Sequence, residues 1–159
     1  MFNAPAAAVG ALVDSLSSTQ DALWPRDQWP AMRLDAPLGL GASGGHGPIR
    51  YSVSEYEPGS RVCFSFTAPS GFDGIHSFEV EAVDEGSTRL RHVVKMDVHW
   101  PASVSWPLVF RPLHDSLLED CLDAAARGLG DVPRDAAWSF WTKLLRRVLS
   151  RRSGRGGTG

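Results

Sequence analysis

Two segments decide the fold: Ile75-His76-Ser77-Phe78-Glu79-Val80-Glu81-Ala82 and Thr88-Arg89-Leu90-Arg91-His92-Val93-Val94-Lys95-Met96-Asp97-Val98. In both, the even-numbered positions are mainly apolar or histidine, and the odd-numbered positions are mostly polar. Successive side chains of a strand point to opposite faces, so this alternation predicts two strands with one buried face each. The short turn Asp84-Glu85-Gly86-Ser87 between them predicts an antiparallel hairpin.

Charged residues on the outward phase predict how these two strands pair. One register gives two opposite-charge cross-strand pairs, Glu81 with Arg89 and Glu79 with Arg91. On the inward phase, the same register places Phe78 opposite His92 and His76 opposite Val94.

Three histidines lie on apolar phases. In the predicted register His76 and His92 are diagonal neighbours, roughly 7–8 Å apart at the backbone. His114 lies on the apolar side of a later helix. All three imidazoles are therefore expected to point into one interior, an apolar cavity with a few polar groups that is typical of a small-molecule site.

Further strands precede the hairpin. Apolar residues alternate with polar ones through 49–54 and again through 61–67, and the composition of 57–60 predicts a turn between them. A brief strand is expected around 32–38, followed by a glycine-rich turn over 39–47. The strands therefore form an antiparallel sheet with one solvated and one buried face.

Helical spacing of apolar residues predicts three helices. The first covers 5–17; the second begins between Trp106 and Pro112 and ends near Gly128 or Gly130. The inner stripe of this second helix is Phe110, Leu113, His114, Leu117, Leu118, Cys121, Leu122 and Ala125. Its predicted outer, solvated face is Asp115, Glu119, Asp120, Asp123 and Arg127. The third helix, over 136–152, has tryptophan and leucine on one side and arginine and lysine on the other.

Composition limits the class of protein. A net charge of −2 gives no reason to expect a nucleic-acid partner. There is no apolar run of the length of a membrane span, roughly 18–20 residues, and the N-terminus lacks the features of a signal peptide. Cys63 falls on a polar phase and Cys121 on a buried one, so we expect two free thiols rather than a disulfide. These features predict a cytoplasmic protein.

The order of elements resembles the SRPBCC superfamily, the helix-grip fold of START domains, polyketide cyclases and pollen-allergen-like proteins. The segments that carry the resemblance are 3–6, 44–51, 53–59 and 111–120, of which the turn Tyr56-Glu57-Pro58-Gly59 before a Val-x-Phe-x-Phe strand is the most specific. The resemblance implies an α+β fold in which a curved antiparallel sheet wraps a long C-terminal helix. It makes 1–130 a ligand-binding domain, to which 131–152 add a basic amphipathic helix and 153–159 a disordered tail. Only Met1–Ala4 stand where the family has a full first strand, and the resulting open edge is a place where a homodimer can pair.

The inward histidines admit three interpretations. They are neutral core residues, or they orient a polar group of a ligand or act as acid and base, since burial keeps a histidine neutral and basic. The third is a zinc site built from all three, although no acidic residue shares their inward phase. We expect no cofactor. Two motif matches, Gly39-Leu40-Gly41-Ala42-Ser43-Gly44 and Gly41-Ala42-Ser43-Gly44-Gly45, are rejected as nucleotide or nucleophile motifs, because both need a following helix and here a strand follows.

The leading hypothesis is that the chain binds a small hydrophobic molecule between sheet and helix, at Tyr51, Val53, Phe64, Phe66, His76, Phe78, Val80, Leu90, His92, Val94, Met96, His114 and Leu118. The first alternative is an enzyme of the polyketide cyclase/dehydrase type, with His76, His92 or His114 as the acid/base. The second is an interaction module that acts through the C-terminal helix. That helix either docks on the protein itself or on a dimer mate, or it makes peripheral membrane contact through 136–152.

Overall fold

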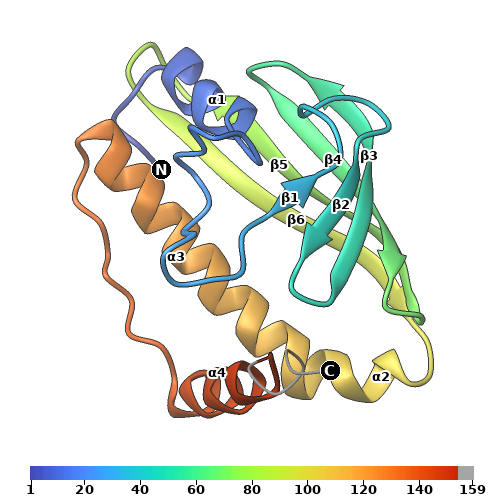
Figure 1. Cartoon of the computed structure of the whole chain (residues 1–159). Coiled ribbons are helices and arrows are strands. Elements are labelled where there is room, and N and C mark those ends of the chain that lie inside the picture. Colours follow the sequence, from blue (N-terminus) through green and yellow to red (C-terminus); the bar gives the residue numbers. More distant parts are fainter. Residues whose placement is uncertain (154–159) are drawn as a thin grey trace.

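The computed structural model describes residues 1–153, and side chains as far as Leu149. Six antiparallel strands form one curved sheet in chain order, and a long helix crosses its concave face (Figure 1). The strands are β1 (Arg33–Leu34), β2 (Ser43–His46), β3 (Ile49–Glu57), β4 (Arg61–Ala68), β5 (Phe72–Ala82) and β6 (Thr88–Val98). The predicted helix-grip architecture is therefore confirmed.

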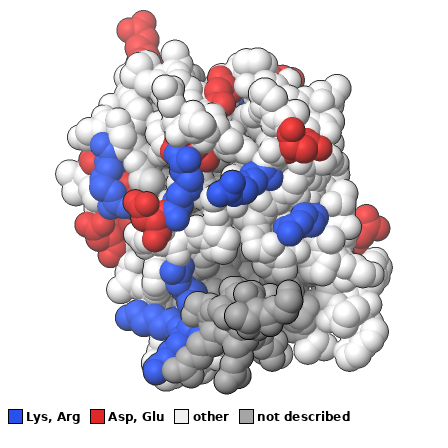
Figure 2. Space-filling model, in the orientation of Figure 1, with Lys and Arg blue, Asp and Glu red and all other residues white. Residues whose placement is uncertain are grey.

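The β5–β6 hairpin has the register that its charges predict. Glu81 faces Arg89 and Glu79 faces Arg91, while His76 faces Val94. The Glu81 carboxylate accepts from Arg89 at 2.9 Å. Acidic and basic side chains are mixed over the upper part of the face drawn in Figure 2.

The helices are α1 (Ala6–Asp14), α2 (Ala102–Ser105), a π-helical turn η1 (Trp106–Phe110), α3 (Arg111–Leu129) and α4 (Phe140–Ser153). The long helical stretch thus begins at Ala102, earlier than predicted, and Pro112 does not interrupt it. The helix ends where Gly130 adopts a left-handed conformation with φ of 76°. No helix in the described part of the chain is long and apolar enough to cross a bilayer.

A proline in the helical stretch creates the place where α4 docks. In a regular α-helix the carbonyl of Leu108 would accept from the N–H of residue 112, which proline lacks. The indole Nε1 of Trp141 on α4 donates to this carbonyl instead, at 2.7 Å. At the next residue of α4, the buried hydroxyl of Thr142 contacts Ser116 Oγ at 3.1 Å.

The glycine-rich segment 39–47 was expected to be a turn, and this expectation is wrong for its second half. Residues 43–46 form β2, which pairs with both β1 and β3. A Cβ at Gly44 would lie 1.9 Å from the carbonyl oxygen of Arg33, so the close approach of β1 requires glycine there. The strand expected over 32–38 shrinks to Arg33–Leu34.

The N-terminal strand remnant forms a single bridge, in which Phe2 pairs with Thr88 at the outer edge of β6. At the other end of the chain, Ser153 is the last residue of α4, so it is helical rather than part of a tail. The rest of the predicted disordered tail, 154–159, lies outside the described residues.

Two carboxylates expected on the solvated face of α3 are buried. Asp120 is 8% exposed because its Oδ2 accepts from the indole nitrogens of Trp29, at 2.6 Å, and Trp138, at 2.8 Å. Asp123 is buried where it accepts from the backbone N–H of Arg134 at 2.8 Å. Cys63 also lies on the predicted polar phase and is nevertheless fully buried.

The same two tryptophans hold an arginine of α4 between their faces. The Arg146 guanidinium carbon lies 4.2 Å from the centre of the Trp29 ring and 3.9 Å from that of Trp138. Asp120, two indoles and Arg146 thus tie the loop before β1, α3 and α4 together, since cation–π contacts and charge-assisted hydrogen bonds are both strong when partly buried.

We predict that Asp120→Ala destabilises the protein by about 2–4 kcal/mol, because two buried indole N–H groups lose their acceptor. Asp120→Asn retains an acceptor oxygen of the same shape and should cost about half as much or less. Urea unfolding followed by tryptophan fluorescence measures both values. Equal losses for the two variants would contradict the assigned role of Oδ2.

Candidate functional site

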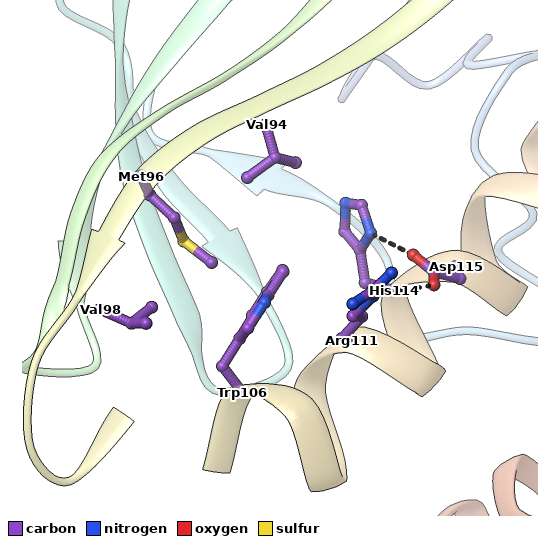
Figure 3. Close-up of a pocket in the computed structure, with 7 residues that line it drawn as sticks. All are labelled: Val94, Met96, Val98, Trp106, Arg111, His114 and Asp115. Carbon is purple, nitrogen blue, oxygen red and sulfur yellow. Dashed lines mark hydrogen bonds and ion pairs between the residues drawn. The ribbon is translucent and has the colours of Figure 1, made fainter. Parts of the chain in front are cut away.

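A pocket of about 310 Å³ opens between the end of β6 and the start of the long helix (Figure 3). Val94, Met96 and Val98 reach it from the inward phase of β6, and Trp106 reaches it from η1. The first turns of α3 complete it with polar side chains, Arg111, His114 and Asp115. One wall is therefore apolar and the other is charged or polar.

The side chains of the polar wall interact with one another. Arg111 and Asp115 form an ion pair at 3.7 Å, with both side chains mostly exposed. The Nδ1 atom of His114 lies 3.3 Å from a carboxylate oxygen of Asp115. This end of the pocket consequently offers a cation, an anion and a neutral or protonated imidazole within one helical turn.

Behind the pocket, histidines continue into the core. The ring of His114 lies 5.0 Å from that of His92, and His92 Nε2 lies 3.3 Å from His76 Nδ1. The His76 ring is stacked between Phe64 and Phe66, with both ring centres 4.9 Å away. The register of the hairpin thus brings together the three histidines that the sequence singled out.

The contact between His76 and His92 fixes their combined hydrogen-bonding capacity. Two neutral rings share one N–H···N bond, so one ring donates and the other accepts. In either arrangement, one N–H and one lone pair are left at the far ends of the pair. Those atoms, His76 Nε2 and His92 Nδ1, are buried and have no hydrogen-bond partner among the described residues. Each such atom costs about 1–3 kcal/mol, and because the two atoms lie at opposite ends of the pair, each needs a partner of its own, one a donor and the other an acceptor.

Burial keeps these imidazoles uncharged. Desolvation, with repulsion from His114 second, lowers the pKa of His92 to about 3. Desolvation also places the pKa of the fully buried His76 well below its usual value of 6.5. In His114 desolvation again lowers the pKa, although the hydrogen bond and charge of Asp115 oppose it.

A fourth histidine, to which the sequence gave no role, lies at the other end of this row. His46 Nδ1 contacts the hydroxyl of the buried Tyr51 at 3.0 Å, and its ring packs 4.8 Å from Trp24. Desolvation lowers the pKa of His46 to about 3. Alternation of apolar and polar residues is the signal that identifies inward positions of a strand. Gly44 and Gly45 precede His46 and have no side chains, so this strand shows no alternation.

The described residues contain no group of three histidine, cysteine or acidic side chains placed to hold a metal ion. The three rings instead form a row, in which the ring of His92 lies 5.4 Å from that of His76 and 5.0 Å from that of His114, both pairs being tilted. The zinc interpretation of the three histidines therefore has no geometric support in this part of the chain.

The residues expected to line a cavity divide into two groups. Val94, Met96 and His114 line the pocket. The others lie deeper in the structure, where Tyr51, Val53, Phe64, His76, Phe78 and Leu90 are buried and Phe66, Val80, His92 and Leu118 are partly buried. Val98, Arg111 and Asp115 line the pocket although the sequence did not place them there. Trp106, which the sequence puts at the strand-to-helix junction near a cavity mouth, reaches the pocket from the π-helical turn.

Comparison with known proteins identifies the fold. No protein-family model and no curated protein matches the chain. A solution structure of a protein from Thermobifida fusca is similar, with a TM-score of 0.61 and 21% identity over 82% of this chain and 91% of that one. The crystal structure of CalU16 from Micromonospora echinospora gives a TM-score of 0.54 and 14% identity, over 97% of this chain and 80% of that one. These likenesses support the helix-grip fold of the chain.

We predict that stability falls as the pH drops below about 6.5, the unfolded value for histidine. The folded pKa of His46 and of His92 is about 3, so between these limits the unfolded chain binds more protons than the folded one. Each such histidine contributes a slope of up to about 1.4 kcal/mol per pH unit, with stability complete above the window and lost on acidification. Urea unfolding at a series of pH values measures the slope, and His92→Phe should reduce it by one proton. A stability that stays level from about pH 7 to pH 5 would contradict neutral burial.

Proposed function

We propose that this protein binds a small, mainly apolar molecule that carries one polar or anionic group. The observation that carries the proposal is the division of the pocket into two walls. Val94, Met96, Val98 and Trp106 offer apolar contact, and Arg111 offers a cation on the opposite side. A volume of about 310 Å³ is at the lower end of the range of ligand pockets, which favours a small ligand.

The fold supports this assignment in a general way. A helix-grip sheet leaves its concave face to be filled by side chains or by a ligand. Here aromatic rings fill the middle of that space: Tyr51, Phe64 and Phe78 are each at most 1% exposed. The space left for a ligand is therefore at the end of the sheet, beside the first turn of α3.

A second candidate function is acid–base catalysis at His114, in an enzyme of the polyketide cyclase/dehydrase type. The specific observation in its favour is the contact between His114 Nδ1 and Asp115, because a carboxylate orients an imidazole and supports its protonated form. His76 and His92 are less suited, since neither lines the pocket. In a catalyst, His114→Gln abolishes turnover and leaves the ligand bound, whereas in a carrier it lowers affinity at most.

The apolar wall is tested with anilinonaphthalene sulfonate, a fluorescent probe with two aromatic units and one anionic group. We predict that Met96→Trp fills the pocket and weakens probe binding about tenfold or more. The matched control is Lys95→Trp, which adds the same side chain at the exposed neighbouring position on the opposite face of β6. Equal binding by both variants would place the probe, and the proposed site, elsewhere.

The polar wall is tested by pairing this probe with phenylnaphthylamine, which has the same rings and no sulfonate. Arg111→Gln should weaken binding of the sulfonate about tenfold, because a charge-assisted hydrogen bond is lost, and should leave the neutral probe unaffected. The ratio of the two dissociation constants, measured by fluorescence titration, is the readout. A ratio that the substitution leaves unchanged would remove Arg111 from the site.

A further inference from the structure

The helical stretch that frames the pocket also carries exposed apolar side chains. Residues 100–110, WPASVSWPLVF, contain no charged residue. Trp106 points into the pocket, but Trp100 is 79% exposed, and Val104 and Leu108 are about half exposed. An isolated exposed leucine needs no explanation, whereas several large exposed apolar side chains along one short segment do.

Helix α4 adds a second row of such side chains. Phe140 is 82% exposed, and Trp141, Leu144 and Val148, which follow it at helical spacing, also have large exposed fractions. The bond from the Trp141 indole to the Leu108 carbonyl brings this row against η1. The two rows therefore meet in one apolar face, which we call the α2–α4 face and define as Trp100, Val104, Leu108, Phe140, Trp141, Leu144 and Val148.

The charged residues of α4 are of one sign. The sequence of α4, FWTKLLRRVLSRRS, contains lysine and arginine but no acidic residue. Figure 2 shows basic side chains at the lower left of the molecule, where α4 lies in Figure 1, and an uncharged surface at the lower right, where α2 lies. The acidic group in the adjoining turn of α3, Asp115, is paired with Arg111.

We propose that the α2–α4 face binds the surface of an anionic lipid bilayer. Exposed tryptophan and phenylalanine suit the interfacial region of a membrane, and the basic residues of α4 suit its negative surface. The occupant is a bilayer because its interface offers an apolar layer to Trp100, Val104 and Leu108 and anionic headgroups to the basic residues of α4.

The position of the face deepens the proposed function. The rim of the pocket, at Arg111 and Asp115, begins one turn after Leu108 on the same helical stretch. A protein bound through this face holds the pocket close to the lipid headgroups, so the ligand is an amphiphile that partitions from the bilayer. This last step rests on the proposed function; the bilayer contact itself does not.

The contact is measured on the full chain without added ligand, by co-sedimentation with vesicles of phosphatidylcholine alone or with a quarter of phosphatidylglycerol. We expect binding to the mixed vesicles that high salt weakens and that is about tenfold lower without phosphatidylglycerol. Leu108→Ser with Phe140→Ser should reduce it about tenfold. The control is Leu40→Ser with Val83→Ser, which removes similar exposed apolar side chains outside the face and should bind like the unaltered chain.

Each other result overturns the inference. Failure to sediment with the mixed vesicles refutes bilayer binding, and an equal effect of the two double variants refutes the assigned face. The chain could instead fail to bind vesicles and form a dimer in solution that the double variant Leu108→Ser with Phe140→Ser dissociates. In that case the face binds a second copy of the chain. The probe titrations with Met96→Trp are independent of all three, so a failed pocket and a failed membrane contact are distinguishable.

Discussion

The pairing of β5 with β6 is the constraint on which the interior depends. It sets His76 and His92 side by side on the concave face, in contact through one N–H···N bond. One imidazole donates to the other, and aromatic neighbours exclude the water that a charged ring would need. The middle of the concave face is thus unfavourable to charge, whereas the end of the sheet beside α3 carries the exposed ion pair of Arg111 and Asp115.

A defect in the long helix connects that end of the sheet to the rest of the chain. Pro112 leaves a carbonyl without its helical donor, and Trp141 supplies one from α4. Further along α4, Arg146 packs over the ring of Trp138, whose indole nitrogen donates to Asp120 on α3. As a result, α4 packs along the outside of the stretch whose inner side forms the pocket. A substitution on the α4 side of this stretch is therefore expected to alter the shape of the pocket on its inner side.

The sequence predicts the elements whose period is regular and fails where tertiary partners override the period. Alternation and opposite charges specify the β5–β6 register completely, because a slip by one residue would expose every inward side chain. For Asp120 the pattern gives the wrong environment. Helical spacing assigns this acidic residue to the solvated face, but the indoles of Trp29 and Trp138 reach it from other segments and bury it. The inward position of His46 is not predicted for a third reason: Gly44 and Gly45 leave its strand without an alternation of apolar and polar side chains.

The sequence predicts which residues face the interior, and the structure adds which of them border a pocket. Inward phase identifies residues that face the interior, but it says nothing of whether neighbouring rings leave space between them. Stacking of His76 against Phe64 and Phe66 fills the middle of the sheet, so the free volume moves towards Met96 and Trp106. A helix-grip interior packed in this way cannot take a ligand as large as the whole concave face. The ligand that we propose would lie at the mouth instead, with its apolar part against β6 and its polar part against α3.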